Sequence, residues 1–576
     1  MRSRYPLYIC LFALFLLASG TAYAFKLAEP NKKPLTLNIE NTLGVEWHNE
    51  HEFDGGTLIG TDDYLKLTET LTASLDWNGF SLGTRIEGLY YPDQLVKRQS
   101  GKDDEQISQD DIRFEKYHFA YDSGKFRLDL GDYYATFGRG LALSMRRSPD
   151  GQLDNSLRGA KFEYKSGGTH AAVLAGFSNT VNVDPTSEDP QPDPNDLVMG
   201  FRAEQRIIDL FNIGAHAVDT RYGVLHSDST RRFIPEMETT VLGASLEFPD
   251  ILGYASFYAE FDHMLRYARK LNEDLDDYAT VSDNGRGLYA SASFFIENFT
   301  LTGEYKLYQD FIFRRGRTKL SYNLEEDAEA PGNLDFYEDI YYNNAPNLER
   351  TDIEFGRDYG NDHGFRFRAE YNSMNTGTVP YAVAYYTVNR WQEQGATSLG
   401  GFGQFEPGFK GDRIYHLWGG VTQYVGQWEM FVDGGYRDEE SRDTGQAIKE
   451  VLHLKLGFSG PVAPKHIIGF EGFAIRRDYQ ILKQLEDDFD LTLSYDLKGA
   501  FSLSFFYTMQ NLDYLPSNGK DEIKHYFAGE ITSRFSDIIE ISIFGGQVRE
   551  SYRCYGGFCR KVPPFEGLKG KVKVRY

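Results

Sequence analysis

The segment Tyr64–Trp77 reads YLKLTETLTASLDW, and apolar and polar residues alternate along almost its whole length. A period of two residues predicts a β-strand, because successive side chains of a strand point to opposite sides of a sheet. Phe489–Leu497 (FDLTLSYDL) and Phe501–Met509 (FSLSFFYTM) repeat the pattern. Similar segments continue from residue 35 to the last residue, and the sequence therefore predicts an all-β protein.

The connections between these segments are sorted by length. Short turns, such as Asn78-Gly79 and Lys498-Gly499, alternate with long polar loops. These loops include Arg221–Glu238, Met264–Arg286 and Asp310–His363, which is the longest. Short periplasmic turns and long extracellular loops are typical of bacterial outer-membrane barrels. Counting hairpins gives about 24 strands, within a range of about 22–26. We therefore expect residues 35–576 to form a transmembrane antiparallel up-and-down β-barrel in the outer membrane.

The last strand supports a barrel with a wet interior. Leu568–Tyr576 reads LKGKVKVRY, with Lys569, Lys571, Lys573 and Arg575 on one face. A Lys or Arg facing lipid at the bilayer midplane costs about 2–4 kcal/mol, so this face should meet a water-filled lumen. The terminal aromatic residue resembles the end that such proteins present to the outer-membrane insertion machinery. Expected partners are that machinery and outer-membrane lipid.

Composition excludes some functions and leaves others open. Aromatic residues make up 15% of the 576 residues, which suits the aromatic girdles of a barrel. The formal net charge of −24 argues against nucleic acid as a partner, because backbone binding needs clustered Lys and Arg. The acidity either solvates the loops or favours cations at a pore mouth.

The first 24 residues have the pattern of a secretory signal peptide. Arg2 and Arg4 precede the apolar run Leu7–Ala18, and Ala22-Tyr23-Ala24 provides a cleavage site. The alternative is a retained N-terminal anchor. Residues 25–34 would form a short periplasmic lead. This lead is too short for an N-terminal plug domain, which argues against the TonB-dependent receptor class.

Cys554 and Cys559 are the cysteines that remain after the predicted cleavage. In an oxidising compartment they are expected to form a disulfide that stiffens the last external loop. Two thiols supply too few ligands for a structural zinc ion.

Three motifs resemble one family. Gly131–Ser144 (GDYYATFGRGLALS), Asp154–Gly159 (DNSLRG) and the late C-x-G-G-x-C-R of Cys554–Arg560 with VPPF resemble a family of uncharacterised bacterial outer-membrane β-barrels. The resemblance implies a single barrel in the outer membrane. It implies no substrate and no catalytic residue.

The glycine-rich segment 131–159 is the candidate for a lumen constriction. A barrel of about 24 strands is wider than porins of 16–18 strands, which already enclose water. An inward-folding segment would narrow it, with Gly138 and Gly140 allowing left-handed backbone. The alternative is one long strand, Leu128–Met145, with glycine kinks. The residues expected at the constriction, or paired with acidic wall residues, are Gly138, Arg139, Gly140, Arg146, Arg147 and Arg158.

We therefore expect a porin-like or gated channel for polar solutes. The alternative is a non-conducting surface receptor or scaffold whose loops bind a partner, and a separate plug protein remains open. H-E-x-x-H does not occur, and no residue can be named as a nucleophile together with its base, so we expect no enzyme and no cofactor. The acidic loop Asp310–His363 and the pair His48 and His51 lack a metal-binding pattern, and no metal site is predicted.

Overall fold

The computed structural model describes residues 35–48, 51–54, 57–61, 64–90, 111–148, 153–178, 181–183, 190–192, 196–208, 210–225, 233–272, 277–309, 311, 314–315, 340–341, 346, 348, 350, 362–389, 413–440, 447–480, 483–512, 522–549, 551–555, 558–562 and 565–575. The expected signal peptide and periplasmic lead lie outside these residues, as does most of the segment 310–363. The side chains of Cys554 and Cys559 also lie outside them.

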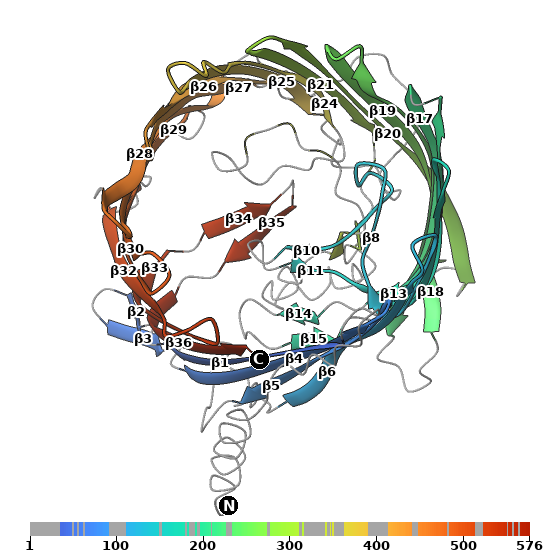
Figure 1. Ribbon diagram of the computed structural model, residues 1–576, viewed down its shortest axis with the longest axis horizontal. Helices are drawn as coiled ribbons and strands as arrows, with labels where there is room; N and C mark the ends of the chain where they lie inside the picture. The colour runs from blue at the N-terminus through green and yellow to red at the C-terminus, as the bar shows by residue number, and fades with distance from the viewer. Residues whose placement is uncertain are drawn as a thin grey trace, which may run out of the picture.

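The described residues form one closed antiparallel sheet of 24 strands (Figure 1). Neighbouring barrel strands follow each other in chain order, and the first strand also pairs with the last. The predicted fold class and strand number are confirmed. The barrel strands are β1 (Thr36–His48), β4 (Tyr64–Trp77), β5 (Phe80–Tyr90), β6 (Asp111–Asp122), β7 (Phe126–Tyr133), β12 (Leu157–Ser166), β13 (Thr169–Ser178), β16 (Leu197–Ile207), β17 (Phe211–Leu225), β18 (Phe233–Ile251), β19 (Ala255–Asn272), β20 (Asp277–Ile296), β21 (Phe299–Gln309), β24 (Asp362–Tyr371), β25 (Thr378–Asn389), β26 (Arg413–Val425), β27 (Trp428–Glu440), β28 (Ala447–Ala463), β29 (His466–Tyr479), β30 (Gln484–Leu497), β31 (Phe501–Leu512), β32 (Glu522–Arg534), β33 (Ile539–Val548) and β36 (Phe565–Arg575).

The barrel closes between β1 and β36. The register runs from Glu40 opposite Arg575 to His48 opposite Gly567. Lys573 Nζ lies 2.8 Å from Glu40 Oε1, and Arg575 Nε lies 3.2 Å from Glu40 Oε2. The basic face of the last strand therefore meets carboxylates of the first strand instead of lipid.

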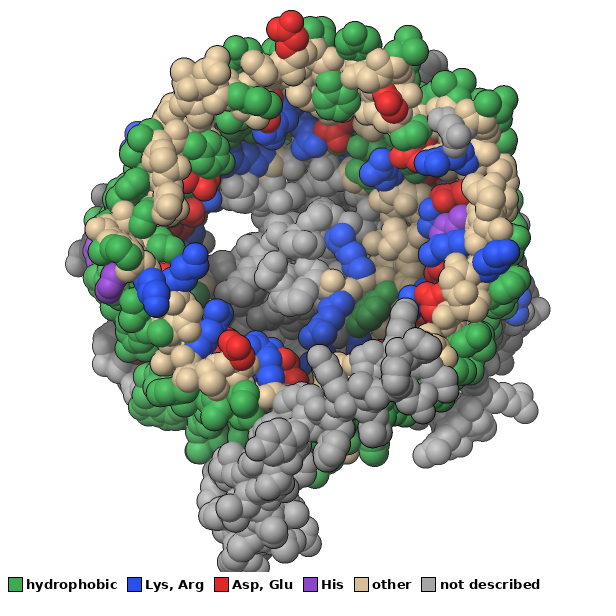
Figure 2. All heavy atoms as spheres, viewed as in Figure 1, with side chains coloured by type: hydrophobic (Ala, Val, Ile, Leu, Met, Phe, Trp, Pro, Cys, Tyr) green, Lys and Arg blue, Asp and Glu red, His purple; other side chains and the backbone are tan. Residues whose placement is uncertain are grey.

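The two faces of the wall differ in chemistry. Large apolar side chains such as Leu417, Leu452 and Phe527 are exposed. Apolar side chains cover the outside of the ring, whereas charged side chains gather on its inner side (Figure 2). In the part of the chain that the structure describes, no helix is long and apolar enough to cross a membrane. A closed sheet satisfies its own backbone hydrogen bonds, and its apolar outer belt suits lipid. The protein is an outer-membrane β-barrel.

Six further two-stranded sheets occur among the described residues, all in the long connections. Several of them project inside the ring when the barrel is viewed along its axis (Figure 1). They pair β2 (His51–Asp54) with β3 (Thr57–Thr61), β8 (Ala135–Phe137) with β9 (Leu143–Met145), β10 (Arg147–Ser148) with β11 (Leu153–Asp154), β14 (Val181–Val183) with β15 (Pro190–Pro192), β22 (Arg314–Arg315) with β23 (Ile340–Tyr341), and β34 (Ser551–Tyr555) with β35 (Phe558–Val562).

The width of the barrel creates a need for internal structure. Strands about 4.8 Å apart and tilted by about 40° enclose, for this number of strands, a cylinder roughly 45–50 Å across between backbones. Side chains of the wall cannot fill such a space. Segments of the long connections between strands must therefore fold into the lumen if the lumen is to be narrowed.

Candidate functional site

The segment 131–159 leaves the wall and forms a hairpin inside the barrel. The wall strand β7 ends at Tyr133, and β8 then pairs with β9 instead of with a barrel strand. The turn between them contains Gly138 and Gly140, with φ of 59° and 93°, and Gly140 N donates to Phe137 O at 3.1 Å. The alternative of one long strand, Leu128–Met145, is therefore wrong. We call residues 135–145 the inner hairpin.

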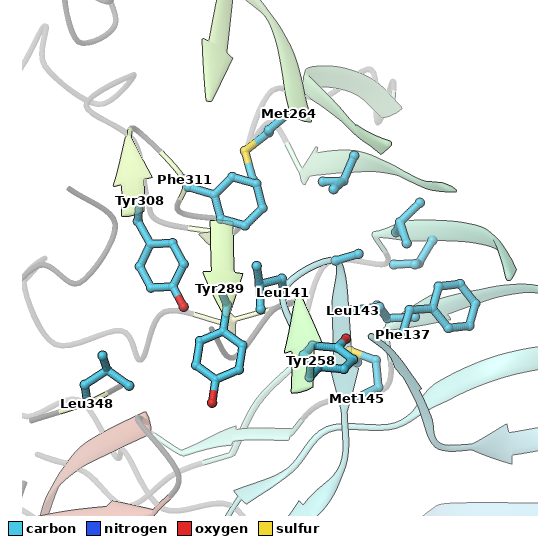
Figure 3. Packing of buried hydrophobic residues seen from close by; sticks show 14 of the residues in the cluster. Phe137, Leu141, Leu143, Met145, Tyr258, Met264, Tyr289, Tyr308, Phe311 and Leu348 are labelled. Atoms are coloured by element: carbon cyan, nitrogen blue, oxygen red, sulfur yellow. The ribbon is translucent and has the colours of Figure 1, made fainter. Parts of the chain in front are cut away.

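The inner hairpin covers an apolar row on the inner wall. Gly200, Val218, Val241 and Met264 are in register across β16, β17, β18 and β19. Phe137 packs against Gly200, where an added Cβ would lie 2.8 Å from the ring. An apolar row facing water would be unfavourable, and covering one Val or Leu side chain contributes about 1.5–3 kcal/mol. The hairpin residues buried in the same cluster are Phe137, Leu141, Ala142, Leu143 and Met145 (Figure 3).

A second segment joins this cluster. Phe311 and Leu348 belong to the long connection 310–363 and are buried in the same apolar core. Tyr308 OH donates to Pro346 O at 3.1 Å, and Arg350 forms an ion pair with Asp433 of β27. The sequence predicted only a surface loop here, but these described residues contact the inner wall.

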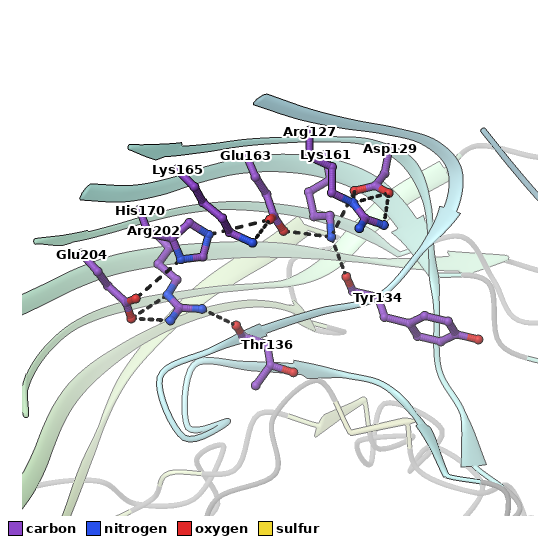
Figure 4. A network of polar contacts seen from close by, with 10 residues as sticks. All are labelled: Arg127, Asp129, Tyr134, Thr136, Lys161, Glu163, Lys165, His170, Arg202 and Glu204. Carbon is purple, nitrogen blue, oxygen red and sulfur yellow. Dashed lines mark hydrogen bonds and ion pairs between the residues drawn. The ribbon is translucent and has the colours of Figure 1, made fainter. Parts of the chain in front are cut away.

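Polar side chains hold the root of the inner hairpin (Figure 4). Lys161 Nζ donates to Tyr134 O at 3.2 Å, and Arg202 Nη1 donates to Thr136 O at 3.1 Å. Both cations belong to a ladder of ion pairs along β7, β12, β13 and β16, in which each cation has a carboxylate neighbour. The charged members of this ladder are Arg127, Asp129, Lys161, Glu163, Lys165, Arg202 and Glu204, and His170 lies 3.7 Å from both Glu163 and Glu204.

A carboxylate of the wall holds the tip. Arg139 N donates to Glu260 Oε2 at 2.7 Å, and Tyr258 OH donates to the same oxygen at 2.5 Å. The Arg139 guanidinium lies 4.5 Å from the centroid of the Tyr258 ring, a cation–π distance. An added Cβ at Gly138 would lie 1.7 Å from Glu260 Oε1, so a larger residue there would displace either the hairpin tip or the carboxylate that holds it.

Three buried polar residues lie beside this tip. His216 Nε2 is 2.6 Å from Asp262 Oδ1 and 3.8 Å from Glu260 Oε1. His216 and Asp262 stand two strands apart, with Gly243 in register between them, and the missing side chain lets them meet. Their potential ligand atoms lie within 4.8 Å of one another, so this trio could hold a metal ion.

The structure does not gather the four predicted arginines at one point. Arg139 lies at the hairpin tip, whereas Arg158 stays in the wall and pairs with Asp132 at 3.1 Å. Arg146 O accepts the N–H of Asn155, and Arg147 opens the small strand β10.

The other sequence candidates lie elsewhere. His48 is buried at the end of β1 beside the ring of Phe565, and the side chain of His51 is outside the described residues. Cys554 stands directly opposite Cys559 in the pairing of β34 with β35, and their disulfide stays a prediction.

Sequence reasoning missed His216, Glu260 and Asp262. Glu260 and Asp262 share one face of a strand, which the alternation in the sequence indicates. His216 comes 46 positions before Asp262, and only the register of three strands brings them together. Gly243, which pairs with both His216 and Asp262, is a sequence signal for this cluster. It can be recognised only when the register of the three strands is known.

Several solved structures align with this chain over most of its length. The copper transporter OprC aligns with a TM-score of 0.45 and 10% identity, over 94% of this chain and 80% of its own. The siderophore receptor PirA from Pseudomonas aeruginosa gives 0.47 and 9%, over 93% and 80%. OccK9 (OpdG) of Pseudomonas aeruginosa gives 0.36 and 12%, over 70% and 94%. At these values the likenesses carry no argument about function.

No curated protein matches the sequence. One family model does match, over residues 7–346, which is more than half of the chain, and its description is a family of unknown function, DUF6029. The matched region contains both the inner hairpin and the wall strands that receive it. The chain therefore belongs to the DUF6029 family.

Proposed function

We propose that this barrel is a channel for polar solutes, narrowed by the inner hairpin docked against the inner wall. One observation carries the proposal: the hairpin is attached at both ends and along its length. Lys161 and Arg202 hold its root, Glu260 holds its tip, and the apolar row receives its buried face. A segment attached in this way occupies a fixed part of the bore.

The inner surface suits polar solutes. Charged side chains of both signs line the described wall, and they are paired with one another across neighbouring strands (Figure 2). A barrel interior of this kind is filled with water. Undocking of the inner hairpin would widen the path, so the same segment provides a gate.

Conductance in planar bilayers tests the proposal. Lys161→Met and Arg202→Met together remove the side chains that hold the root, whereas Lys165→Met is a matched control. Lys165 pairs with Glu163 in the same ladder, at 3.0 Å, and its side chain is 57% exposed. We expect the wild type to conduct, and the double variant to show a larger or more frequent open state. The control should behave as the wild type.

Two outcomes contradict the proposal. Equal conductance of wild type, double variant and control would remove the hairpin from the path. Closed barrels in all three would favour the alternative function, a surface receptor or scaffold. In that case a protein partner captured by the barrel should be lost when residues 316–339 are replaced by a short Gly-Ser linker.

A further inference from the structure

We propose that His216, Glu260 and Asp262 form a binding site for one divalent transition-metal ion, of the Zn²⁺ or Mn²⁺ class, on the inner wall beside the hairpin tip. The proposal concerns the wall itself. It stands whether or not the barrel conducts.

The donor set and its spacing fit such an ion. One imidazole nitrogen and two carboxylate oxygens are ligands that Zn²⁺ and Mn²⁺ both accept. Ligand atoms on a tetrahedral zinc ion lie about 3.4 Å apart, because each bond is about 2.0–2.2 Å long. His216 Nε2 lies 2.6 Å from Asp262 Oδ1 and 3.8 Å from Glu260 Oε1. All the potential ligand atoms lie within 4.8 Å of one another, so shifts of about 1–1.5 Å would bring three of them onto one ion.

Burial provides the independent reason for a cation. The exposed fractions are 1% for Glu260, 0% for Asp262 and 6% for His216. Among the described residues, Glu260 Oε1 and Asp262 Oδ2 are buried and have no hydrogen-bond partner. Two adjacent buried carboxylates repel each other, and each unsatisfied oxygen carries a desolvation cost. A divalent ion bound through Glu260 Oε1 and the Asp262 carboxylate would satisfy the unpartnered Glu260 oxygen and compensate both charges.

The backbone leaves room at this point. Gly243 lies in register between His216 and Asp262, and an added Cβ there would be 2.0 Å from Asp262 Oδ1. Gly138 of the hairpin closes the site from the other side. A glycine on each side of the site, one in the wall and one in the hairpin, lets the ligand side chains approach one another closely.

Metal binding would also stabilise the docked hairpin. Glu260 Oε2 accepts the N–H of Arg139 and the hydroxyl hydrogen of Tyr258, while Oε1 points toward His216. An ion bound through Oε1 would fix the orientation of this carboxylate. Groups that orient a ligand commonly tune metal affinity by 10–100-fold. Docking of the inner hairpin should therefore raise the affinity for the metal ion, and metal binding should stabilise the docked hairpin.

The test uses the full barrel, purified without a histidine tag and treated with EDTA. Zn²⁺ is added, unbound ion is removed by dialysis, and bound zinc is measured by mass spectrometry. Isothermal titration gives the affinity, and Co²⁺ serves as a spectroscopic probe of ligand geometry. The variants are His216→Ala and Asp262→Asn, which keeps the shape of the side chain. His466→Ala is the control, because His466 bonds to Tyr495 OH outside this cluster.

We expect one zinc ion per wild-type barrel and at least a tenfold loss of affinity in both variants, with no loss in the control. Heat-dependent migration on gels checks that each variant is folded. If His216→Ala does not fold, Asp262→Asn and a zinc-dependent rise in the unfolding temperature of the wild type still decide the matter. A wild-type barrel that retains no zinc, or equal loss in the control, overturns the proposal. None of these measurements depends on conductance, so a negative result for zinc binding can be told apart from a negative result for the channel function.

Discussion

At the scale of single residues, two glycines allow the close contacts between the inner hairpin and the wall. Gly138 adopts a left-handed φ of 59° and faces a carboxylate at a distance that leaves no room for a Cβ. Gly243 lets two ionisable side chains meet across an intervening strand. A glycine loses more conformational entropy on folding than any other residue, so a fixed glycine is unfavourable unless a close contact requires it. At Gly138 and Gly243, a neighbouring side chain fills the space that a Cβ would take.

Gly138→Ala should release the hairpin tip. The substitution would force the tip away from Glu260 and break the hydrogen bond from Arg139 N, which is worth about 1.5–3 kcal/mol for a charged acceptor. We expect trypsin to cleave after Arg139 or Arg146 at least tenfold faster in folded barrels. Gly167→Ala is a matched control, because Gly167 has the same φ of 59° and nothing within 4 Å of its added Cβ. Equal protection in both variants would contradict this view of the tip.

At the scale of elements, the docking surface is a row that runs across strands. Val218 and Val241 face the lumen one strand apart, and each would be an unfavourable inward residue without the inner hairpin. The hairpin matches them with a short apolar stretch around Leu141. Hydrophobic burial and the polar contacts at the root and tip therefore act on the same docked position.

Leu141→Ala should weaken docking along this row. Truncating a fully buried leucine costs about 2–5 kcal/mol, depending on how far the cavity collapses. We expect hydrogen exchange of residues 135–145 to accelerate, while exchange of the barrel strands stays unchanged. Leu130→Ala is the control, because Leu130 lies on the wall strand β7 with an exposed side chain on the lipid side. Exchange that accelerates equally in both variants would show that the row does not hold the hairpin.

The sequence predicts the elements better than their contacts. Alternation identified β4, β30 and β31 correctly, and the basic face of β36 was correctly expected to point into the lumen. The segments 221–238 and 264–286 were expected as polar loops, yet β17, β18, β19 and β20 extend into them as strands of 15–20 residues. Polar residues that face water on both sides of a strand give no alternation, so periodicity cannot find these extensions.

The candidate site depends on register, which the sequence does not contain. The glycine-rich composition around Gly138 indicated an irregular segment, and position 139 was among the predicted constriction residues. Arg158 was grouped with it, although it lies in the wall and pairs with Asp132. The partner of the hairpin tip, Glu260, is 121 positions from Arg139 in the chain. Such a contact follows from the order and register of six wall strands, not from any local pattern.

At the scale of the whole molecule, the closing seam joins strands from the two ends of the sheet. Lys569 Nζ lies 2.9 Å from Glu46 Oε1, and these residues are 523 positions apart. Pairings of such separation require most of the barrel to be in place first, since long loops must close before they form. The seam is therefore where we expect a loss of charge pairing to affect assembly most.

Glu40→Lys should destabilise the seam more than a like change elsewhere in the wall. It removes a partner of Lys573 and one of the two carboxylates beside Arg575, which keeps Glu540 at 3.7 Å, and it places a third cation beside them. Glu40 is 38% exposed, so each lost pair is worth only about 0.2–1 kcal/mol, and the repulsion adds to it. We expect a lower temperature of heat modification on gels and slower refolding from urea into detergent.

The matched control for this prediction is Glu471→Lys. Glu471 pairs with Lys455 at 3.0 Å and is 47% exposed, in the middle of the wall between β28 and β29. Glu471→Lys loses one local pair where Glu40→Lys loses two, and the strands that this pair joins are neighbours in the chain and pair without long-range closure. Refolding of this variant should stay near the wild-type rate. The exchange Glu40→Lys with Lys573→Glu should recover part of the lost stability, because it restores one attractive pair across the seam. If Glu40→Lys and Glu471→Lys slow refolding equally, closure between β1 and β36 is not the step that limits assembly.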